Sequence, residues 1–229
     1  MLNSWAVAQP HARYALFGQD CTLCGRAGDE LLCEACVGSL SRVHDACARC
    51  ALPRSSRVCG PCIARAPRFD DALAAFEYRF PVDRLVQRFK YAGDLAIGRW
   101  LGERLAEKVV HAQRPHLVVS PPSTPQRLRE RGFNPALEIA KRVARHLGVP
   151  CAIRGLARSR STSPQPGLGR AAREANVEGA LRCDVNVAGM HVALVDDVMT
   201  TGATANAAAN VLKQAGAARV SVWVVARTP

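Results

Sequence analysis

The chain has 229 residues, a formal net charge of +12 at pH 7 and 48% hydrophobic residues. Such a length accommodates one domain of ordinary size and a small second module. No apolar stretch approaches the length that crosses a bilayer, and the first residues lack the basic segment and apolar core of a secretion signal. We therefore expect a cytoplasmic protein without membrane insertion.

Eight cysteines near the N-terminus form four Cys-x-x-Cys pairs, separated by eight, ten and eight residues. Each pair can place two thiolates on one ion, so the eight supply two tetrahedral four-cysteine sites, the closed geometry of structural zinc. Disulfides, which need an oxidising compartment, and redox chemistry are the competing interpretations. We predict two structural Zn²⁺ sites. Their ligands are Cys21, Cys24, Cys33, Cys36, Cys47, Cys50, Cys59 and Cys62.

The spacing does not decide which pairs share an ion. Two successive ribbons, residues 21–36 and 47–62, are the simplest arrangement, and a crossed pairing is the alternative. A segment of this size buries little apolar surface, so metal must supply its stability. We expect a double zinc ribbon over residues 15–66 and a second domain over residues 70–229.

The second domain alternates strands with helices. Residues 71–78 and 117–119 are typical of strands, whereas residues 81–90 and 95–112 carry apolar side chains at helical spacing. After residue 119 comes a proline-rich loop that contains three arginines. A further helix is expected from about residue 134 to residue 147, with Asn134 as its cap.

Residues 155–178 are polar and rich in Ser, Pro and Gly, which is typical of a functional loop, and we expect a mobile lid there. Arg158 and Arg173 would bring positive charge to a departing anion when the lid closes. From Arg127 to Arg173 the chain carries eleven Arg or Lys residues against two acids. This excess favours polyphosphates or nucleic acid, although a solvated basic face is the alternative.

Residues 192–195 form the continuous apolar run of a strand covered on both faces, which predicts a parallel sheet and an α/β fold. Asp196 and Asp197 are expected where this strand leaves the sheet, and they can accept hydrogen bonds from sugar hydroxyls. A Thr/Gly loop and an alanine-rich helix follow. Gly202 permits close approach to a ligand, and the threonine hydroxyls beside a helix N-terminus favour a monophosphate.

The order of acid pair and phosphate loop indicates a ribose 5-phosphate site. A helix-capping or metal-holding role for the two carboxylates is the alternative. A nucleotide-hydrolysing motor is excluded, because its phosphate loop needs the dipeptide Gly-Lys, which does not occur in the sequence. The predicted ligand-binding residues are Asp196, Asp197, Thr200, Thr201, Gly202, Ala203 and Thr204.

The acid pair and its TTGAT loop resemble the signature of type I phosphoribosyltransferases, whose substrate is phosphoribosyl pyrophosphate (PRPP). Together with the Cys-x-x-Cys pairs, FKYAGD (residues 89–94), RLRERGFN (127–134) and LVDDVMTTGAT (194–204) resemble the competence protein F (ComF) family, which is similar to amidophosphoribosyltransferases. The resemblance implies that the acid pair holds the ribose hydroxyls and the loop holds the 5-phosphate, with Mg²⁺ bridging pyrophosphate and ribose.

Further expectations concern the rest of the site. The loop after residue 119 lies on the same sheet edge as the acid pair and is expected to face the pyrophosphate. Its candidate residues are Ser120, Pro121, Pro122 and Arg127. The candidates for catalysis are Arg158, Arg173 and Lys90, the last only through the resemblance. No residue is recognisable as a dedicated general base, so the acceptor is expected to supply its own nucleophile, and turnover is left open.

The resemblance also implies a role in DNA uptake during natural transformation. Single-stranded DNA and a DNA translocase or recombination factor are the implied partners. The alternative function is a non-catalytic factor that binds PRPP or single-stranded DNA. The sequence does not indicate the acceptor or the oligomeric state.

Overall fold

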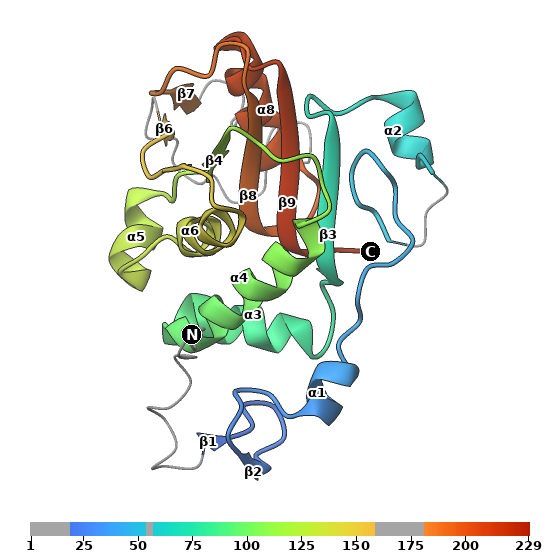
Figure 1. Cartoon of the computed structure of the whole chain (residues 1–229), viewed down its shortest axis with the longest axis vertical. Coiled ribbons are helices and arrows are strands. Elements are labelled where there is room, and N and C mark those ends of the chain that lie inside the picture. The colour runs from blue at the N-terminus through green and yellow to red at the C-terminus, as the bar shows by residue number, and fades with distance from the viewer. Residues whose placement is uncertain (1–18, 54–56, 159–180) are drawn as a thin grey trace, which may run out of the picture. The chain divides into compact units, whose positions relative to one another are not determined.

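The computed structural model describes residues 19–53, 57–158 and 181–229. Its contacts divide the chain into two compact units, residues 1–40 and 41–229, which are considered separately (Figure 1). The second group of four cysteines therefore belongs to the larger unit. The domain boundary expected between residues 66 and 70 stays a prediction.

The smaller unit is built around a short hairpin. Strands β1 (Gln19–Asp20) and β2 (Ala27–Gly28) pair antiparallel, and helix α1 (Glu34–Gly38) follows. Few of its described apolar side chains are buried, and Leu32 and Leu40 are the largest of them. Such a core is too small to account for a stable fold without a further cross-link.

The larger unit alternates strands and helices along the chain. Its elements are α2 (Gly60–Ala64), β3 (Asp71–Glu77), α3 (Val82–Ala92), α4 (Leu95–Val109), β4 (Leu117–Val119), α5 (Pro125–Arg131), α6 (Pro135–Leu147), β5 (Cys151–Ala152), β6 (Leu156–Arg158), β7 (Leu181–Cys183), β8 (His191–Met199), α8 (Ala203–Gln214) and β9 (Arg219–Arg227).

Five strands form one parallel sheet in the order β3-β9-β8-β4-β5. The parallel α/β fold expected from the sequence is thereby confirmed. Strands β8 and β9 lie at the centre and are buried along most of their length, because helices cover both faces of the sheet. Strands β6 and β7 form a separate antiparallel pair.

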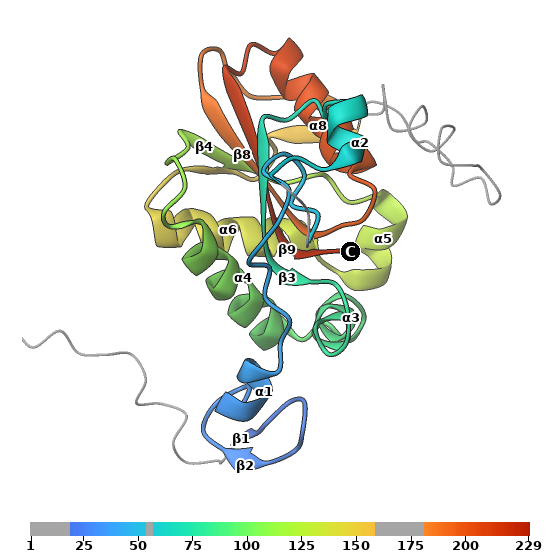
Figure 2. The same cartoon turned by 90° about the vertical axis from the view of Figure 1, so that its right-hand side faces the viewer.

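Helices α4 and α6 cover one face of the sheet and α8 covers the other (Figure 2). The two helices on the shared face approach closely, since a Cβ atom on Gly102 of α4 would lie 2.9 Å from the Cβ atom of Arg142 on α6. Helix α3 lies at the end of the sheet where β3 and β9 finish (Figure 1).

The chain leaves two neighbouring strands in opposite directions. After β4 it passes through α5 and α6 to the edge strand β5, whereas after β8 it passes through α8 to β9 on the other side. In open α/β sheets, ligands bind in the crevice at such a switch point, outside the carboxyl ends of the strands. The loops that follow Val119 and Met199 flank this point.

Most expected elements are present, but two expectations were wrong. Strand β8 continues to Met199, so the acid pair lies inside the strand and not beyond it. The proline-rich loop contains helix α5, whose first turn is capped by the Thr124 hydroxyl, 3.2 Å from the backbone nitrogen of Arg127. Asn134 is the cap residue of α6, as expected, but its side chain makes no cap hydrogen bond, and its amide donates to the Pro121 carbonyl oxygen at 2.9 Å.

Within the described parts of the chain, none of the helices combines the length and the apolar character that a bilayer crossing requires.

Candidate functional site

The acid pair is positioned by the central strand β8 and neutralised in part by a lysine from α3. Lys90 Nζ lies 2.8 Å from Asp197 Oδ1, and their side chains are only 18% and 12% exposed. Asp196 accepts the backbone N–H of Asp197 at 2.8 Å. The structure therefore brings together the two predicted ribose-binding carboxylates and one of the predicted catalytic candidates.

The carboxyl group of Asp196 is unusually basic. Burial, together with the neighbouring charge of Asp197, raises its pKa to about 7, while Lys90 and Arg127 act in the opposite direction. Two acids in one low-dielectric environment resist simultaneous ionisation. A strongly shifted carboxyl group beside specific charged partners is a candidate for a functional site.

The FKYAGD segment holds Lys90 in place through contacts on either side of it. The ring of Phe89 packs on Phe133 with centroids 5.3 Å apart, and Arg131 lies over the Tyr91 ring at 4.8 Å from its centroid. Asp94 then begins α4 by accepting the Ile97 N–H at 3.3 Å. Two segments that are distant in sequence, FKYAGD and RERGFN, are thus one packed assembly beside the acid pair.

The loop from Thr200 to Thr204 opens helix α8. Gly202 is the cap residue of this helix and has φ of 80°, a backbone conformation that favours glycine. The Thr201 hydroxyl accepts the Ala203 N–H at 3.3 Å, and the side chains of Thr200, Thr201 and Thr204 are exposed. Exposed hydroxyls at the N-terminus of a twelve-residue helix form a surface suited to an anion.

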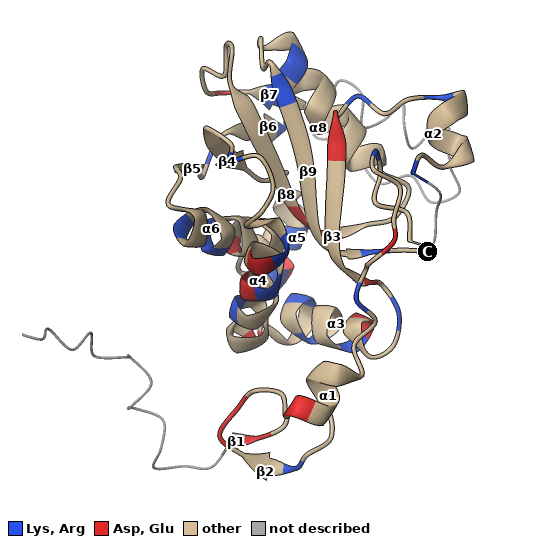
Figure 3. Ribbon diagram, turned by 45° about the vertical axis from the view of Figure 1, so that its right-hand side comes forward, with Lys and Arg blue, Asp and Glu red and all other residues tan. Residues whose placement is uncertain are grey.

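The candidate pyrophosphate loop follows β4, next to β8 in the sheet. Ser120 is buried, and the Pro121 carbonyl is held by Asn134 at 2.9 Å. Arg127 is exposed on α5, and its positive charge reaches Asp196. Figure 3 shows further Lys and Arg on α5 and α6. The basic character expected for this edge is therefore present beside the acid pair.

The remaining catalytic candidates belong to the expected lid. Arg158 is the last residue of β6 and pairs in register with Leu181 of β7. Arg173 and most of the expected lid lie outside the described residues.

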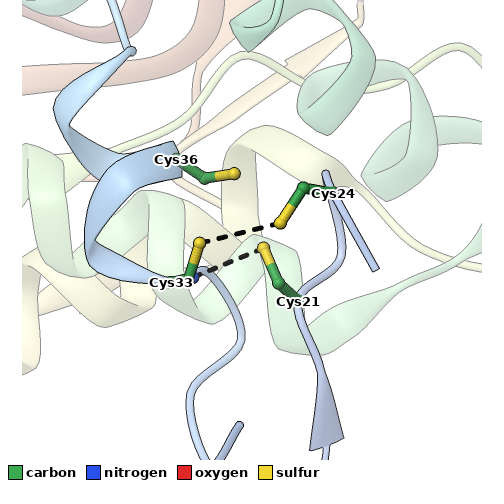
Figure 4. Close-up of side chains that lie close together, drawn as sticks. All are labelled: Cys21, Cys24, Cys33 and Cys36. Atoms are coloured by element: carbon green, nitrogen blue, oxygen red, sulfur yellow. Dashed lines mark hydrogen bonds between the residues drawn. The ribbon is translucent and has the colours of Figure 1, made fainter. Parts of the chain in front are cut away.

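The eight ribbon cysteines form two clusters in chain order. In each cluster the four sulfur atoms lie within 4.8 Å of one another, as expected for the ligands of a single ion. Figure 4 shows the first cluster, with side chains from the hairpin and from α1 directed toward one another. Of the two pairings open at the sequence level, the structure has the successive one. The clusters are Cys21, Cys24, Cys33 and Cys36, then Cys47, Cys50, Cys59 and Cys62.

The two clusters share one backbone design. The N–H of Cys33 donates to Cys21 Sγ at 3.4 Å, and the N–H of Cys59 donates to Cys47 Sγ at 3.3 Å. Each donor is the cap residue of a short helix. The residue after the second cysteine has a positive φ in both, 71° in one and 53° in the other. The clusters are thus structural repeats.

The thiols of each cluster differ in acidity in a way that suits a divalent cation. Backbone N–H groups of Cys24 and Cys33 lower the pKa of Cys21 to about 6. Desolvation raises the pKa of Cys36 to about 12, and its cysteine neighbours add to the shift. Burial raises the pKa of Cys47, but N–H groups of Cys59 and Cys50 outweigh it and lower the pKa to about 6. Cys21 and Cys47 therefore form thiolates readily, whereas Cys36 needs a bound cation to ionise at neutral pH.

A residue that the sequence analysis missed lies behind the phosphate loop. Arg227, at the end of β9, is buried and hydrogen-bonded to backbone carbonyls of both the loop and the second cysteine cluster. A pocket of about 730 Å³ is lined by residues 200–203, by three cysteines of that cluster and by Arg227. The only signal in the sequence was an arginine that ends an apolar run.

The comparisons with known proteins agree with this geometry. The family profile described as "Phosphoribosyl transferase domain" matches residues 134–229, which span α6 to β9. The fold and this match define the larger unit as a type I phosphoribosyltransferase fold, preceded by cysteine clusters that fit zinc-ribbon modules.

The similar proteins include two curated relatives and a solved structure. "DNA utilization protein YhgH" of Salmonella typhimurium is 31% identical over 205 residues, covering 86% of this chain and 90% of the relative. "Competence protein F" of Haemophilus influenzae is 30% identical over 207 residues, with coverage of 86% and 90%. Among solved structures, glutamine PRPP amidotransferase from B. subtilis is 24% identical over 60% of this chain and 30% of that chain, with a TM-score of 0.41. The chain belongs to the competence protein F family.

Proposed function

We propose that the protein binds PRPP with Mg²⁺ at the switch point of its sheet and acts in the utilisation of DNA taken up by the cell. One observation supports the ligand above all. A lysine-paired acid pair on the central strand β8 directly precedes an exposed threonine loop at a helix N-terminus. The pair would receive the ribose hydroxyls and the loop would receive the 5-phosphate.

The pyrophosphate is assigned to the adjacent loop. Ser120, Pro121 and Pro122 end β4 next to β8, and Arg127 adds a positive charge close to Asp196. Mg²⁺ bound together with the ligand would neutralise negative charge on the pyrophosphate, next to the carboxylates of Asp196 and Asp197.

Ligand binding would change the anionic partner of the Lys90 ammonium. In the structure its ammonium is bonded to Asp197. When ribose hydroxyls donate to that carboxylate, the lysine is displaced toward the negative charge of the pyrophosphate. If transfer occurs, the bond from C1 to the pyrophosphate oxygen breaks, its electron pair leaves with that oxygen, and the acceptor's lone pair forms the new bond to C1. Lys90 and Arg127 would stabilise the leaving charge, with Arg158 and Arg173 added from the lid.

The two cysteine clusters are assigned to structural Zn²⁺. Four sulfur ligands in a closed group leave no open position for substrate, which separates a structural from a catalytic zinc site. In the smaller unit the metal would replace the missing apolar core.

The cellular role is proposed from the relatives' names, "DNA utilization protein" and "Competence protein F". We place the protein in the cytoplasm, working beside a DNA translocase or recombination factor. A non-catalytic factor that binds PRPP or single-stranded DNA is the second candidate function. The net charge of +12 and the exposed arginines on α5 favour it, since basic surfaces attract nucleic acid with steep salt dependence.

Calorimetric titration with PRPP and Mg²⁺ tests the proposal. The zinc-loaded protein is expected to bind, and the double variant Asp196→Asn, Asp197→Asn is expected to lose binding with unchanged zinc content. The surface variant Asp184→Asn, which removes a carboxylate bonded to Arg182, is the control and should bind normally. Binding that survives the double change would refute the ribose assignment, and no binding by the intact protein would refute the PRPP site.

A further inference from the structure

Arg227 is enclosed by backbone oxygens from three segments of the larger unit. Its side chain is 8% exposed. Nη1 donates to the carbonyls of Met199 at 3.2 Å, Thr200 at 2.6 Å and Thr228 at 2.6 Å, and Nε donates to the Cys50 carbonyl at 3.1 Å. A buried guanidinium is tolerated when its N–H groups are paired in this way, and losing one acceptor leaves a charged donor unsatisfied.

These contacts orient the first peptides of the phosphate loop. A peptide unit is planar and trans, so its N–H points away from the direction of its C=O. With the Met199 and Thr200 carbonyls turned toward Arg227, the N–H groups of Thr200 and Thr201 point to the opposite side of the loop. Arg227 also places a fixed positive charge behind the N-terminus of α8, which strengthens its attraction for an anion.

The same side chain reaches the second cysteine cluster. Cys50 is a member of that cluster, and its carbonyl belongs to the turn in which the Ala51 N–H donates to the Cys47 carbonyl at 2.8 Å. The segment after the cluster makes a second connection, because the Arg68 N–H donates to Asn206 Oδ1 of α8 at 2.9 Å. Hydrogen bonds of Arg227 and Asn206 therefore connect the backbone of the second cluster, and of the segment after it, to the phosphate loop and to α8.

We propose that Arg227 is a positioning residue that couples the second cysteine cluster to the phosphate loop, so that metal at this cluster sets the loop geometry that a phosphate ligand meets. The ligand part of this inference rests on the proposed function, whereas the coupling itself does not. Among the described residues, the hydrogen bonds of Arg227 reach Cys50 of the second cluster and no residue of the first, so we expect the coupling to involve the second cluster. The phosphate loop would thus respond to one of two otherwise similar metal sites.

The first experiment compares Arg227→Gln with Arg219→Gln in the zinc-loaded full chain. Arg219 is a control from the other end of β9, where it pairs with Asp71 at 2.7 Å. Hydrogen exchange is followed by mass spectrometry in peptides covering residues 200–204 and, as a reference, β4 and α6. Faster exchange is expected in the loop alone, and only for Arg227→Gln. The Kd of the Arg227→Gln variant for PRPP with Mg²⁺ is expected to rise about tenfold or more, because hydrogen bonds to a buried charge are lost.

The second experiment removes one metal at a time. Cys62→Ser is expected to lower the zinc content by one equivalent and to accelerate exchange in the loop. Cys36→Ser, the matched change in the first cluster, is expected to lose the same amount of zinc without affecting the loop. Arg227→Lys keeps the positive charge but cannot reproduce the forked set of N–H donors of the guanidinium, so its loop exchange should resemble that of Arg227→Gln. It replaces Arg227→Gln in the experiment if that variant does not fold.

The outcomes separate the two proposals. If the intact protein does not bind PRPP, the proposed function fails, and loop exchange still decides the coupling. If a folded Arg227 variant exchanges in the loop like the intact protein, the coupling is refuted even where PRPP binds. Equal loosening of the loop by Cys36→Ser and Cys62→Ser also refutes it. Should both Arg227 variants fail to fold, the cysteine pair decides alone.

Discussion

Lys90 Nζ of α3 and Asp197 Oδ1 of β8 lie 2.8 Å apart, and both side chains are largely shielded from water. The pair connects a helix at the end of the sheet to the central strand. Because a shielded ion pair is held by its mutual attraction, removing one partner leaves the other with an uncompensated desolvation cost.

A double-mutant cycle measures this pair. Lys90→Gln is expected to lower the free energy of unfolding by about 2 kcal/mol. When Asp197→Asn is added to this variant, about 1 kcal/mol of the loss should be recovered. Urea unfolding of the four proteins gives the coupling. Arg88→Gln is the control, because the ion pair of Arg88 with Asp94 is half exposed on the arginine side and should contribute less than about 0.5 kcal/mol. Additive losses at Lys90 and Asp197 would contradict the prediction.

The raised pKa of Asp196 predicts a pH dependence of stability. Its value rises from 3.8 to about 7 in the folded protein, so between these values the folded state binds a proton that the unfolded state releases. The contribution of Asp196 therefore favours folding below pH 4 and is lost as pH rises toward 7. Relative to Asp196→Asn, the intact protein should become progressively less stable across this window and then level off. Urea unfolding at a series of pH values checks the difference.

The same protonation affects ligand binding. Acceptance of ribose hydroxyls favours the ionised acid pair, so PRPP binding near pH 6.5 should release a proton, and affinity should increase with pH up to about 7. Titrations in buffers of different ionisation enthalpy measure the proton directly. Proton uptake, or no pH dependence of affinity through this range, would be inconsistent with a protonated Asp196 in the free protein.

The close contact of α3 and α4 makes Gly98 indispensable. A Cβ atom there would lie 2.2 Å from Cε2 of Phe89, whose side chain is fully buried. Gly98→Ala is expected to destabilise the fold by about 1–3 kcal/mol, despite the better helix propensity of alanine. It should also weaken PRPP binding, because Phe89 precedes Lys90.

A second variant checks that the clash is the cause. Phe89→Leu opens space opposite residue 98, so the double variant with Gly98→Ala should be more stable than the sum of the two single changes predicts. Thermal unfolding of the four proteins is the measurement. If the effects of the two changes simply add, the destabilisation by Gly98→Ala does not come from a clash with Phe89.

Metal removal should affect the smaller unit before the sheet. Its described part buries little apolar surface, so its fold depends on the metal at the first cluster. A chelator is expected to make the segment around Cys21–Cys36 sensitive to protease, while peptides from β8 and β9 stay protected. Metal analysis should give two equivalents before treatment. Resistance of the first segment in metal-free protein would show that the cluster is not what stabilises it.

Local patterns predicted well where the relevant contacts are local. The Cys-x-x-Cys spacing identified the metal clusters because each pair lies within one turn of the backbone. The apolar run before Asp196 identified the central strand of a parallel sheet, since both faces of such a strand are covered. Strand β9 has the same apolar run but was not predicted.

Contacts between distant segments were beyond local patterns. Asn134 has the residue type and place of a helix cap, yet its amide bonds to Pro121, which packing brings near. The partnership of Lys90 with Asp197 depends on how α3 lies at the end of the sheet. Arginine is usually exposed, so nothing in the sequence predicted that Arg227 would be buried among carbonyls.

The pairing of β3 with β9 has a consequence for the order in which the fold forms during synthesis. Asp71 of β3 lies opposite Ser221 of β9, so one of the first strands to leave the ribosome pairs with the last. Chains grow at roughly 5–20 residues per second, which leaves β3 without its neighbour for several seconds or longer. A solitary apolar strand is prone to aggregation during that time. Recombinant yield is therefore expected to depend on the rate of translation.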